Sequence, residues 1–232
     1  MIRAAIFDYN GVLVDDEHVH FELLRDVLAE EGIALTERDY YGEYLGYDDR
    51  GCFETALRRA GQPLSVERIE ELIARKASRY AARAESGLKL FRGAAEAVAR
   101  LARAWPVAVC SGALRPEIEY GLSRLGVRDV VDVIISAEDT DRCKPDPEGY
   151  FLALDALRSE GREDLEAGHC LVIEDSMAGI ESAKAAGMWV VGVTHTYPAD
   201  ELRRSGADAT IESLTALNPE WVRRLFTPEI SP

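Results

Sequence analysis

Acidic and small polar residues follow several short apolar segments of this sequence. Asp8 follows IRAAIF, Ser111 and Gly112 follow PVAVC, and Glu174 and Asp175 follow CLVI. Carboxylate oxygens are the ligands that Mg²⁺ prefers, and a hydroxyl group with neighbouring backbone amides can bind a phosphate. If the fold brings these residues together, they suit a magnesium ion and a phosphate group.

A lysine with the same potential lies in the segment RCKPDPE. Lys144 directly precedes a predicted helix N-terminus, where free backbone amides and the helix dipole favour anions. Taken singly, each of these polar residues has an ordinary explanation as a turn, helix-cap or surface residue. Their occurrence after successive apolar segments favours one shared site, because that order rarely arises by chance.

The apolar segments themselves have the pattern of buried parallel strands. They are short, rich in β-branched residues and without polar alternation. Helical sequences with good capping signals separate them, as in SGALRPEIEYGLSRLG and EDSMAGIESAKAAG. This alternation predicts an α/β fold with a doubly wound, mostly parallel, Rossmann-like sheet. In such sheets ligands bind at the carboxyl ends of the strands, where the polar residues lie.

One region breaks the alternation of strands and helices. Between Asp16 and Glu85 the sequence contains only helix-like stretches, such as SVERIEELIARKASRYAARAES. We therefore predict an inserted α-helical cap domain over residues 16–85 and an α/β core domain formed by residues 1–15 and 86–232. The exit segment SGLKLFRG has a glycine at each side, which suits a hinge.

The net charge of −15 argues against nucleic acid or an anionic membrane as a partner. No apolar run approaches the roughly 20 residues that a membrane span needs. The N-terminal sequence MIRAAIFDYN lacks the basic stretch and apolar core of a signal peptide, so we expect a cytoplasmic protein. Positive charge for a bound phosphate then has to come from a metal ion, a lysine and helix N-termini.

Four segments resemble the motifs of the haloacid dehalogenase-like (HAD) hydrolase superfamily. They are FDYNGVLVD, CSGA, KPDPEGY and VIEDSMAGIESAKAAGM. The similarity extends over essentially the whole chain, and it is greatest to the helical-cap branch that includes phosphoglycolate phosphatases and β-phosphoglucomutase. It implies a Mg²⁺-dependent phosphatase, monomeric or homodimeric, whose partner is a small phosphorylated metabolite such as a sugar phosphate.

The resemblance also implies roles for the residues that match its motifs. Asp8 would be the nucleophile that forms an aspartyl-phosphate. Ser111 and the backbone amide of Gly112 would bind the transferring phosphoryl group. Lys144 would join them as a catalytic and phosphate-binding residue that offsets negative charge in the transition state.

The same resemblance implies a magnesium site. Asp175 would bind Mg²⁺ together with the Asp8 carboxylate and the backbone carbonyl of Asn10, and Glu174 would support this site. The cap of such proteins closes over the leaving group and excludes water. Two cap residues are therefore candidate substrate contacts: His20, where these proteins often carry His-Phe, and Arg50 in the turn YLGYDDRG.

Asn10 departs from the family pattern. Hydrolases of the family carry an aspartate there, which protonates the leaving oxygen and then activates water. An amide has no proton that it readily gives and no basic site near neutral pH. General acid–base catalysis contributes roughly 10²–10⁴-fold in rate. We therefore expect Asn10 to leave binding nearly intact and to impair turnover.

Several alternatives follow from Asn10. The protein is a slow phosphatase, or a phosphatase in which His20 carries the proton, or an enzyme whose reaction needs no acid. Alternatively, it is an engineered inactive variant or a catalytically silent protein that binds a phosphometabolite. An enzyme that needs no acid would resemble phosphonoacetaldehyde hydrolases or haloacid dehalogenases. The first use a lysine early in the cap, which is missing here, and the second need no magnesium, whereas Glu174–Asp175 indicates a metal. A β-phosphoglucomutase-like phosphomutase is a further alternative, because the sequence does not distinguish hydrolysis from transfer.

Overall fold

A computed structural model of the chain describes residues 1–226. Within this range six strands form one parallel sheet in the order β3-β2-β1-β4-β5-β6, which confirms the predicted fold class. The strands are β1 (Ala4–Phe7), β2 (Val107–Cys110), β3 (Val133–Ile135), β4 (Cys170–Glu174), β5 (Trp189–Val193) and β6 (Ala209–Ile211). The helices are α1 (Glu17–Glu30), α2 (Glu37–Asp39), α3 (Asp49–Arg59), α4 (Val66–Gly87), α5 (Ala94–Ala102), α6 (Arg115–Leu125), α7 (Glu148–Ser159), α8 (Met177–Ala185), α9 (Ala199–Arg204) and α10 (Pro219–Phe226).

Helices cover both faces of the sheet because side chains alternate along each strand. Ala5 and Phe7 of β1 pack on the side of α5, α6 and α10. Ala4 and Ile6 point the other way, into a second core with α7, α8 and α9. All four are fully buried, which explains why the strands are apolar without alternation.

Strand β1 lies at the centre of the sheet, between β2 and β4. The register pairs Phe7 with Val109 on one side and with Ile173 on the other. The chain order changes direction at this strand, which makes its carboxyl end the topological switch point. The first residue beyond it, Asp8, therefore lies between the ends of two neighbouring strands.

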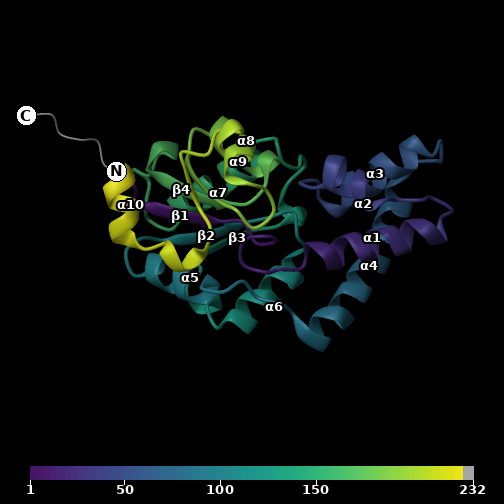
Figure 1. Cartoon of the computed structure of the whole chain (residues 1–232), viewed down its shortest axis with the longest axis horizontal. Helices are drawn as coiled ribbons and strands as arrows, with labels where there is room; N and C mark the ends of the chain where they lie inside the picture. Colours follow the sequence, from purple (N-terminus) through teal and green to yellow (C-terminus); the bar gives the residue numbers. More distant parts are fainter. Residues whose placement is uncertain (227–232) are drawn as a thin grey trace, which may run out of the picture.

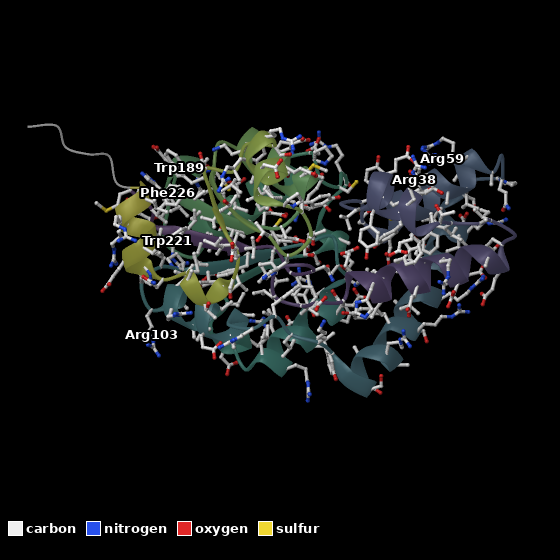
Figure 2. All side chains as sticks on the ribbon, viewed as in Figure 1. Arg38, Arg59, Arg103, Trp189, Trp221 and Phe226 are labelled. Carbon is white, nitrogen blue, oxygen red and sulfur yellow. The ribbon has the colours of Figure 1, made fainter. Side chains whose placement is uncertain are left out.

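Helices α1 to α4 form a separate group beside the carboxyl ends of the strands (Figure 1). They have their own apolar core, which includes Leu28, Phe53, Leu57 and Leu72. This is the predicted helical cap; the division at residues 16 and 85 stays a prediction. Figure 2 shows the labelled Arg38 and Arg59 on this group, at the opposite end of the molecule from Trp189 and Phe226 beside α10.

Two elements of the fold differ from the sequence predictions. The strand β6 is not predicted by the sequence pattern, because it has only three residues, of which Ile211 alone is buried, and it carries little apolar signal. The stretch TERDYYGEYLG belongs to the region between Asp16 and Glu85 that reads as helical, but it forms only the three-residue α2 followed by a π-helix, η1 (Tyr40–Tyr44). Within residues 1–226 no helix combines the length and apolarity needed to cross a membrane.

Candidate active site

The end of β1 places Asp8 against a buried lysine. Lys144, in the loop before α7, donates from Nζ to Asp8 Oδ1 at 2.8 Å and to Glu174 Oε1 at 2.6 Å. Burial raises the pKa of Asp8 to about 7, although Lys144 acts in the opposite direction. Burial also disfavours the charged amine, but Asp8 and Glu174 hold the pKa of Lys144 well above its ordinary value. The sequence prediction that these residues converge is thus met by direct contacts.

Glu174 is fully buried and uses both of its carboxylate oxygens within the protein. Oε1 accepts from Lys144 and, at 3.1 Å, from the hydroxyl of Tyr150. Oε2 accepts from the backbone N–H groups of Asp175 and Ser176, each at 3.0 Å, and from the Ser176 hydroxyl. These contacts fix Lys144 and the start of the loop after β4, so Glu174 supports the site rather than offering a free oxygen.

Three buried carboxylates form a cluster that fits a divalent cation. One carboxylate oxygen of each of Asp8, Glu174 and Asp175 lies within 4.8 Å of the others, and the Glu174 oxygens already accept hydrogen bonds from the protein. Burial, and then the neighbouring Glu174 and Asp8, raises the pKa of Asp175 well above its ordinary value. Such crowding of acids is relieved by a hard cation with oxygen ligands. The donor set therefore fits Mg²⁺.

The backbone beside this cluster requires glycine. Gly11 has a φ of +72°, and a Cβ atom there would lie 2.0 Å from Oδ2 of Asp175. A side chain at this position would occupy the space in front of the carboxylate. The carbonyl oxygen of Gly11 lies 2.8 Å from Nδ1 of His195, and the His195 ring stacks on Phe91. His195 thus holds the loop after β1, a role that its sequence position alone does not indicate.

Ser111 and Gly112 follow β2 on the other side of Asp8. The Ser111 hydroxyl donates to Oδ1 of Asn10 at 3.2 Å and accepts from the backbone N–H of Ala113. Gly112 lies under the cap: a Cβ atom there would be 3.4 Å from Cβ of Asp48. Both residues line the same pocket as Asp8 and Lys144, which is the arrangement predicted for a phosphate-binding site.

The side chain of Asn10 is held at both ends. While Oδ1 accepts from Ser111, Nδ2 donates to the two carboxylate oxygens of Asp16 at 3.1 and 3.2 Å. Asp16 is only 1% exposed and also accepts from the Tyr80 hydroxyl. Burial raises the pKa of Asp16, but His20, Tyr80 and Asn10 outweigh it and hold the value below the ordinary range. The sequence does not predict the Asn10–Asp16 pair.

His20 belongs to a polar cluster on the cap side of the pocket. Its Nε2 atom lies 3.1 Å from Asn10 Nδ2, and its Nδ1 atom lies 2.8 Å from Nζ of Lys76. Lys76 is 1% exposed and donates to Oδ1 of Asp49. His20, Asp49 and Lys76 line the pocket together with Glu117 from α6.

Sequence reasoning missed Lys76 and Glu117, although α4 carries a signal. The buried residues of α4 recur at helical spacing as Ile69, Leu72, Lys76, Tyr80 and Ala84. A lysine inside an apolar stripe is buried with the rest of that stripe and needs a partner. This spacing in the sequence is enough to single out Lys76 as a buried, paired lysine.

The structure does not bring Arg50 into this cluster. Its side chain is exposed and lines a separate surface depression with Glu54 and Leu64. Arg50 lies in the first turn of α3 next to Asp49, and the helix directs the two neighbours to different sides. The contact with substrate predicted for Arg50 therefore has no support from its position.

The chain belongs to the haloacid dehalogenase-like hydrolases, whose family model matches residues 2–187. It is 30% identical to validoxylamine A 7'-phosphate phosphatase from Streptomyces hygroscopicus subsp. limoneus, over 93% of this chain and 95% of the relative. Its fold is similar to that of β-phosphoglucomutase from Clostridium difficile, with a TM-score of 0.83, 22% identity and coverage of 97% of each chain.

A second solved structure is of interest because it carries an asparagine in place of an aspartate. This is a mutant of CbbY from Rhodobacter sphaeroides in complex with xylulose-(1,5)bisphosphate. It is 25% identical to the chain, with a TM-score of 0.78, and the match covers 94% of this chain and 100% of that protein. The family and its relatives make the chain a hydrolase of the phosphatase kind.

Proposed function

We propose that the protein is a Mg²⁺-dependent phosphoric monoester hydrolase that acts on a small phosphorylated metabolite, such as a sugar phosphate, through an aspartyl-phosphate on Asp8. The observation that carries this proposal is the contact between Asp8 and Lys144 at the end of β1, with Ser111 and Asp175 beside it. The names of the phosphatase relative and of the CbbY complex support a phosphorylated carbohydrate as the substrate class.

In this mechanism Asp8 attacks the phosphorus atom, an Asp8 oxygen–phosphorus bond forms, and the bond to the leaving oxygen breaks. Water then cleaves the aspartyl-phosphate and releases inorganic phosphate. Lys144, the Ser111 hydroxyl and the Gly112 amide would bind the phosphoryl oxygens and offset their charge. Asp8, Asp175 and the backbone carbonyl of Asn10 would hold Mg²⁺, which supplies positive charge between the attacking carboxylate and the phosphate.

Asn10 limits this reaction at the step that needs a proton. An alkoxide leaving group requires an acid, but the amide of Asn10 donates to Asp16 and lies 3.1 Å from Nε2 of His20, and it has no proton that it readily gives up. Loss of general acid–base catalysis corresponds to about 3–5 kcal/mol of barrier. Asn10 also lacks a basic site to activate the water that cleaves the aspartyl-phosphate, so this second step is slow for every substrate. Substrates whose leaving group departs without a proton avoid the first slow step, and we expect them to turn over faster than sugar phosphates.

Acetyl phosphate provides the test, because acetate leaves as a stable anion. The protein is expected to hydrolyse acetyl phosphate with Mg²⁺, to lose this activity on addition of EDTA, and to lose it in the variant Asp8→Asn. Asp141→Asn, which removes an acid from an exposed loop instead, is the matched control and should retain the activity. Hydrolysis that persists in Asp8→Asn would contradict the proposal.

The second candidate is a catalytically silent protein that binds a phosphometabolite. The observation that favours it is the hydrogen bonding of both ends of the Asn10 side chain, which stabilises an amide at this position. The two candidates differ in one measurement: a silent protein binds sugar phosphates in calorimetry but hydrolyses neither them nor acetyl phosphate.

A further inference from the structure

The pocket above Asp8 continues to the cap, and each end holds one lysine among carboxylates. At the phosphate end lie Asp8, Asp175, Lys144 and Ser111; at the other end lie the carboxylates of Glu17, Asp49 and Glu117 with Lys76 and His20. A substrate phosphate at Asp8 would direct its leaving group toward this second end. We refer to Glu17, His20, Asp49, Lys76 and Glu117 as the leaving-group end of the pocket.

Glu117 is the member of this end without a full set of partners. It lies in the first turn of α6 and is only 8% exposed. Oε2 accepts a long hydrogen bond of 3.4 Å from the N–H of Leu114, whereas Oε1 is buried and has no hydrogen-bond partner. A buried acceptor without a partner destabilises the folded protein. Because the Glu117 residue lines the pocket, a hydrogen-bond donor on a bound ligand would satisfy this orphan oxygen after a small rotation of the side chain.

No cation at this end is free to bind a second anion. Among residues 1–226, Lys76 and Lys144 are the lysines and arginines that line the pocket. Lys76 is paired with Asp49, and Lys144 with Asp8 and Glu174. Arg115, on the same helix as Glu117, instead pairs with Asp139 and donates to a backbone carbonyl.

Burial raises the pKa of Glu117 to about 7, so above this pH an anionic group on the leaving group would meet three carboxylates. The two cationic residues at this end, Lys76 and His20, are already paired with Asp49 and Asp16. Glu17 is bonded to the Tyr40 hydroxyl, and Asp49 to Lys76, so neither can turn away without breaking a hydrogen bond. In a partly buried site like charges repel more strongly than in water. A neutral hydroxyl or a cationic ammonium group meets no such repulsion and satisfies the orphan oxygen.

We propose that Glu117 is a specificity-determining residue that accepts a hydrogen bond from a hydroxyl or ammonium group of the leaving group, and that this end of the pocket rejects a second phosphate or a carboxylate. The inference rests on the proposed phosphatase function and names its substrate class: monophosphates of polyols or amino-polyols. It also separates this chain from a phosphomutase, which must hold a second phosphate away from the nucleophile, and from the CbbY relative in complex with a bisphosphate.

Four sugar phosphates of similar size test the proposal in one experiment. Glucose 6-phosphate offers hydroxyls, glucosamine 6-phosphate an ammonium group, 6-phosphogluconate a carboxylate and glucose 1,6-bisphosphate a second phosphate. Their binding in the presence of Mg²⁺ is measured by calorimetry and as inhibition of acetyl phosphate hydrolysis. The first two are expected to bind at least about tenfold more tightly than the last two, since a difference of 1.4 kcal/mol is tenfold.

The variant Glu117→Gln identifies the residue responsible. It keeps the shape and an acceptor oxygen but removes the charge. We expect it to lower the affinity for glucosamine 6-phosphate by about tenfold, which is the value of one charge-assisted hydrogen bond. The affinity for glucose 6-phosphate should fall less, and the affinity for the bisphosphate should rise. Glu119→Gln, which removes a charge from the same helix outside the pocket, should leave all four affinities unchanged.

The outcomes distinguish this inference from the proposed function. Equal affinity for all four ligands, or tighter binding of the bisphosphate by the unmodified protein, would overturn the inference even if Glu117→Gln fails to fold. A failure to hydrolyse acetyl phosphate counts against the phosphatase function alone. In that case the four affinities measured by calorimetry still support or overturn the inference about Glu117. A preference for glucosamine 6-phosphate over glucose 6-phosphate assigns the ligand donor as ammonium; the reverse order assigns it as hydroxyl.

Discussion

Asn10 and Asp16 form a hydrogen-bonded pair in which Asp16 carries the carboxylate, whereas Asn10 contacts Ser111 of the predicted phosphate-binding site. The amide donates to both oxygens of Asp16, and Asp16 is nearly inaccessible. An acid introduced at position 10 would therefore not enter an empty environment. It would face a buried carboxylate at about hydrogen-bonding distance, and two like charges so close cannot both ionise freely.

This pair determines what restoration of an acid will achieve. We expect Asn10→Asp alone to gain little turnover of sugar phosphates and to lose stability, whereas Asn10→Asp with Asp16→Asn recovers most of the roughly 10²–10⁴-fold contribution of acid–base catalysis. Steady-state kinetics and thermal unfolding of the single and double variants measure this. Asp15→Asn combined with Asn10→Asp is the control for charge. Equal turnover in the single and double variants would show that Asp16 does not oppose the new acid.

Gly11 tests how the backbone shapes the metal site. Gly11→Ala introduces a Cβ atom at the Asp175 carboxylate and strains a φ of +72°. Gly32→Ala has the same kind of strain, with a φ of +76°, but nothing within 4 Å of the new atom. Both are expected to lower stability by roughly 1–2 kcal/mol. Mg²⁺-dependent hydrolysis of acetyl phosphate should be lost only in Gly11→Ala, and its retention there would contradict the assignment of Asp175.

The burial of Glu117 has a consequence for stability at different pH values. Burial raises the pKa of Glu117 from its ordinary 4.5 to about 7, while His20 of α1 and Lys76 of α4 lower it and Asp49 of α3 and Asp16 raise it. Between these pH values the folded protein binds more protons at this residue than the unfolded chain. Its contribution to stability is thus fully present below pH 4.5 and is lost as the pH rises through about 7.

Denaturant unfolding of the protein and of Glu117→Gln at several pH values checks this sign. The variant lacks the titrating group, so its stability relative to the unmodified protein should increase between pH 4.5 and 7 and level off above that range. A constant difference over this range would mean that Glu117 titrates normally in the folded state.

At the scale of the elements, α4 joins the cap core to the active site through one lysine. Four apolar positions of its buried stripe pack against the cap or core, and the fifth, Lys76, reaches Asp49 of α3 and His20 of α1. Removal of one partner from a buried ion pair leaves an uncompensated charge, which costs about 3–5 kcal/mol. We expect Lys76→Met to destabilise the protein by an amount of this order.

A double-mutant cycle separates the pair from general packing. Asp49→Asn in the Lys76→Met background removes the stranded charge and should restore part of the lost stability. Arg79→Met, three residues along on the exposed side of α4, is the control and should change stability by less than about 1 kcal/mol. Additive losses from Lys76→Met and Asp49→Asn would show that the two side chains do not depend on each other.

The elements show how far the sequence could predict this protein. The five strands rich in β-branched residues and the cap were predicted, because burial on both faces and helical periodicity each leave a strong pattern. Asp8, Ser111, Lys144 and Asp175 were brought together by reasoning from strand ends. The Asn10–Asp16 pair was not predicted, since it depends on the conformation of the loop between β1 and α1. The Lys76–Asp49 pair was not predicted either, since it depends on how α3 and α4 pack together.

At the scale of the whole molecule, the cap is docked on the core through close backbone contacts. The segment between η1 and α3 lies over the site: a Cβ atom on Gly46 would be 2.8 Å from Cβ of Ala178 on α8, and one on Gly112 would touch Asp48. These contacts leave no room for larger side chains while the cap is closed. Closure also completes the pocket, whose lining comes from both the cap and the core.

A larger residue at position 178 is therefore expected to hold the cap away from the core. Ala178→Leu adds three carbon atoms where Gly46 approaches, on a partly exposed helix turn that the fold itself does not need to bury. Because a displacement of about 1 Å at a reacting site can cost up to roughly 10²-fold, we expect kcat/KM for acetyl phosphate to fall on the order of tenfold or more. The radius of gyration from X-ray scattering should increase while the melting temperature changes little.

Ala185→Leu, at the exposed end of α8, adds the same side chain away from the cap and should leave all three quantities unchanged. If Ala178→Leu retains full activity with an unchanged radius of gyration, then contact between Gly46 and α8 is not required for the closed, active arrangement.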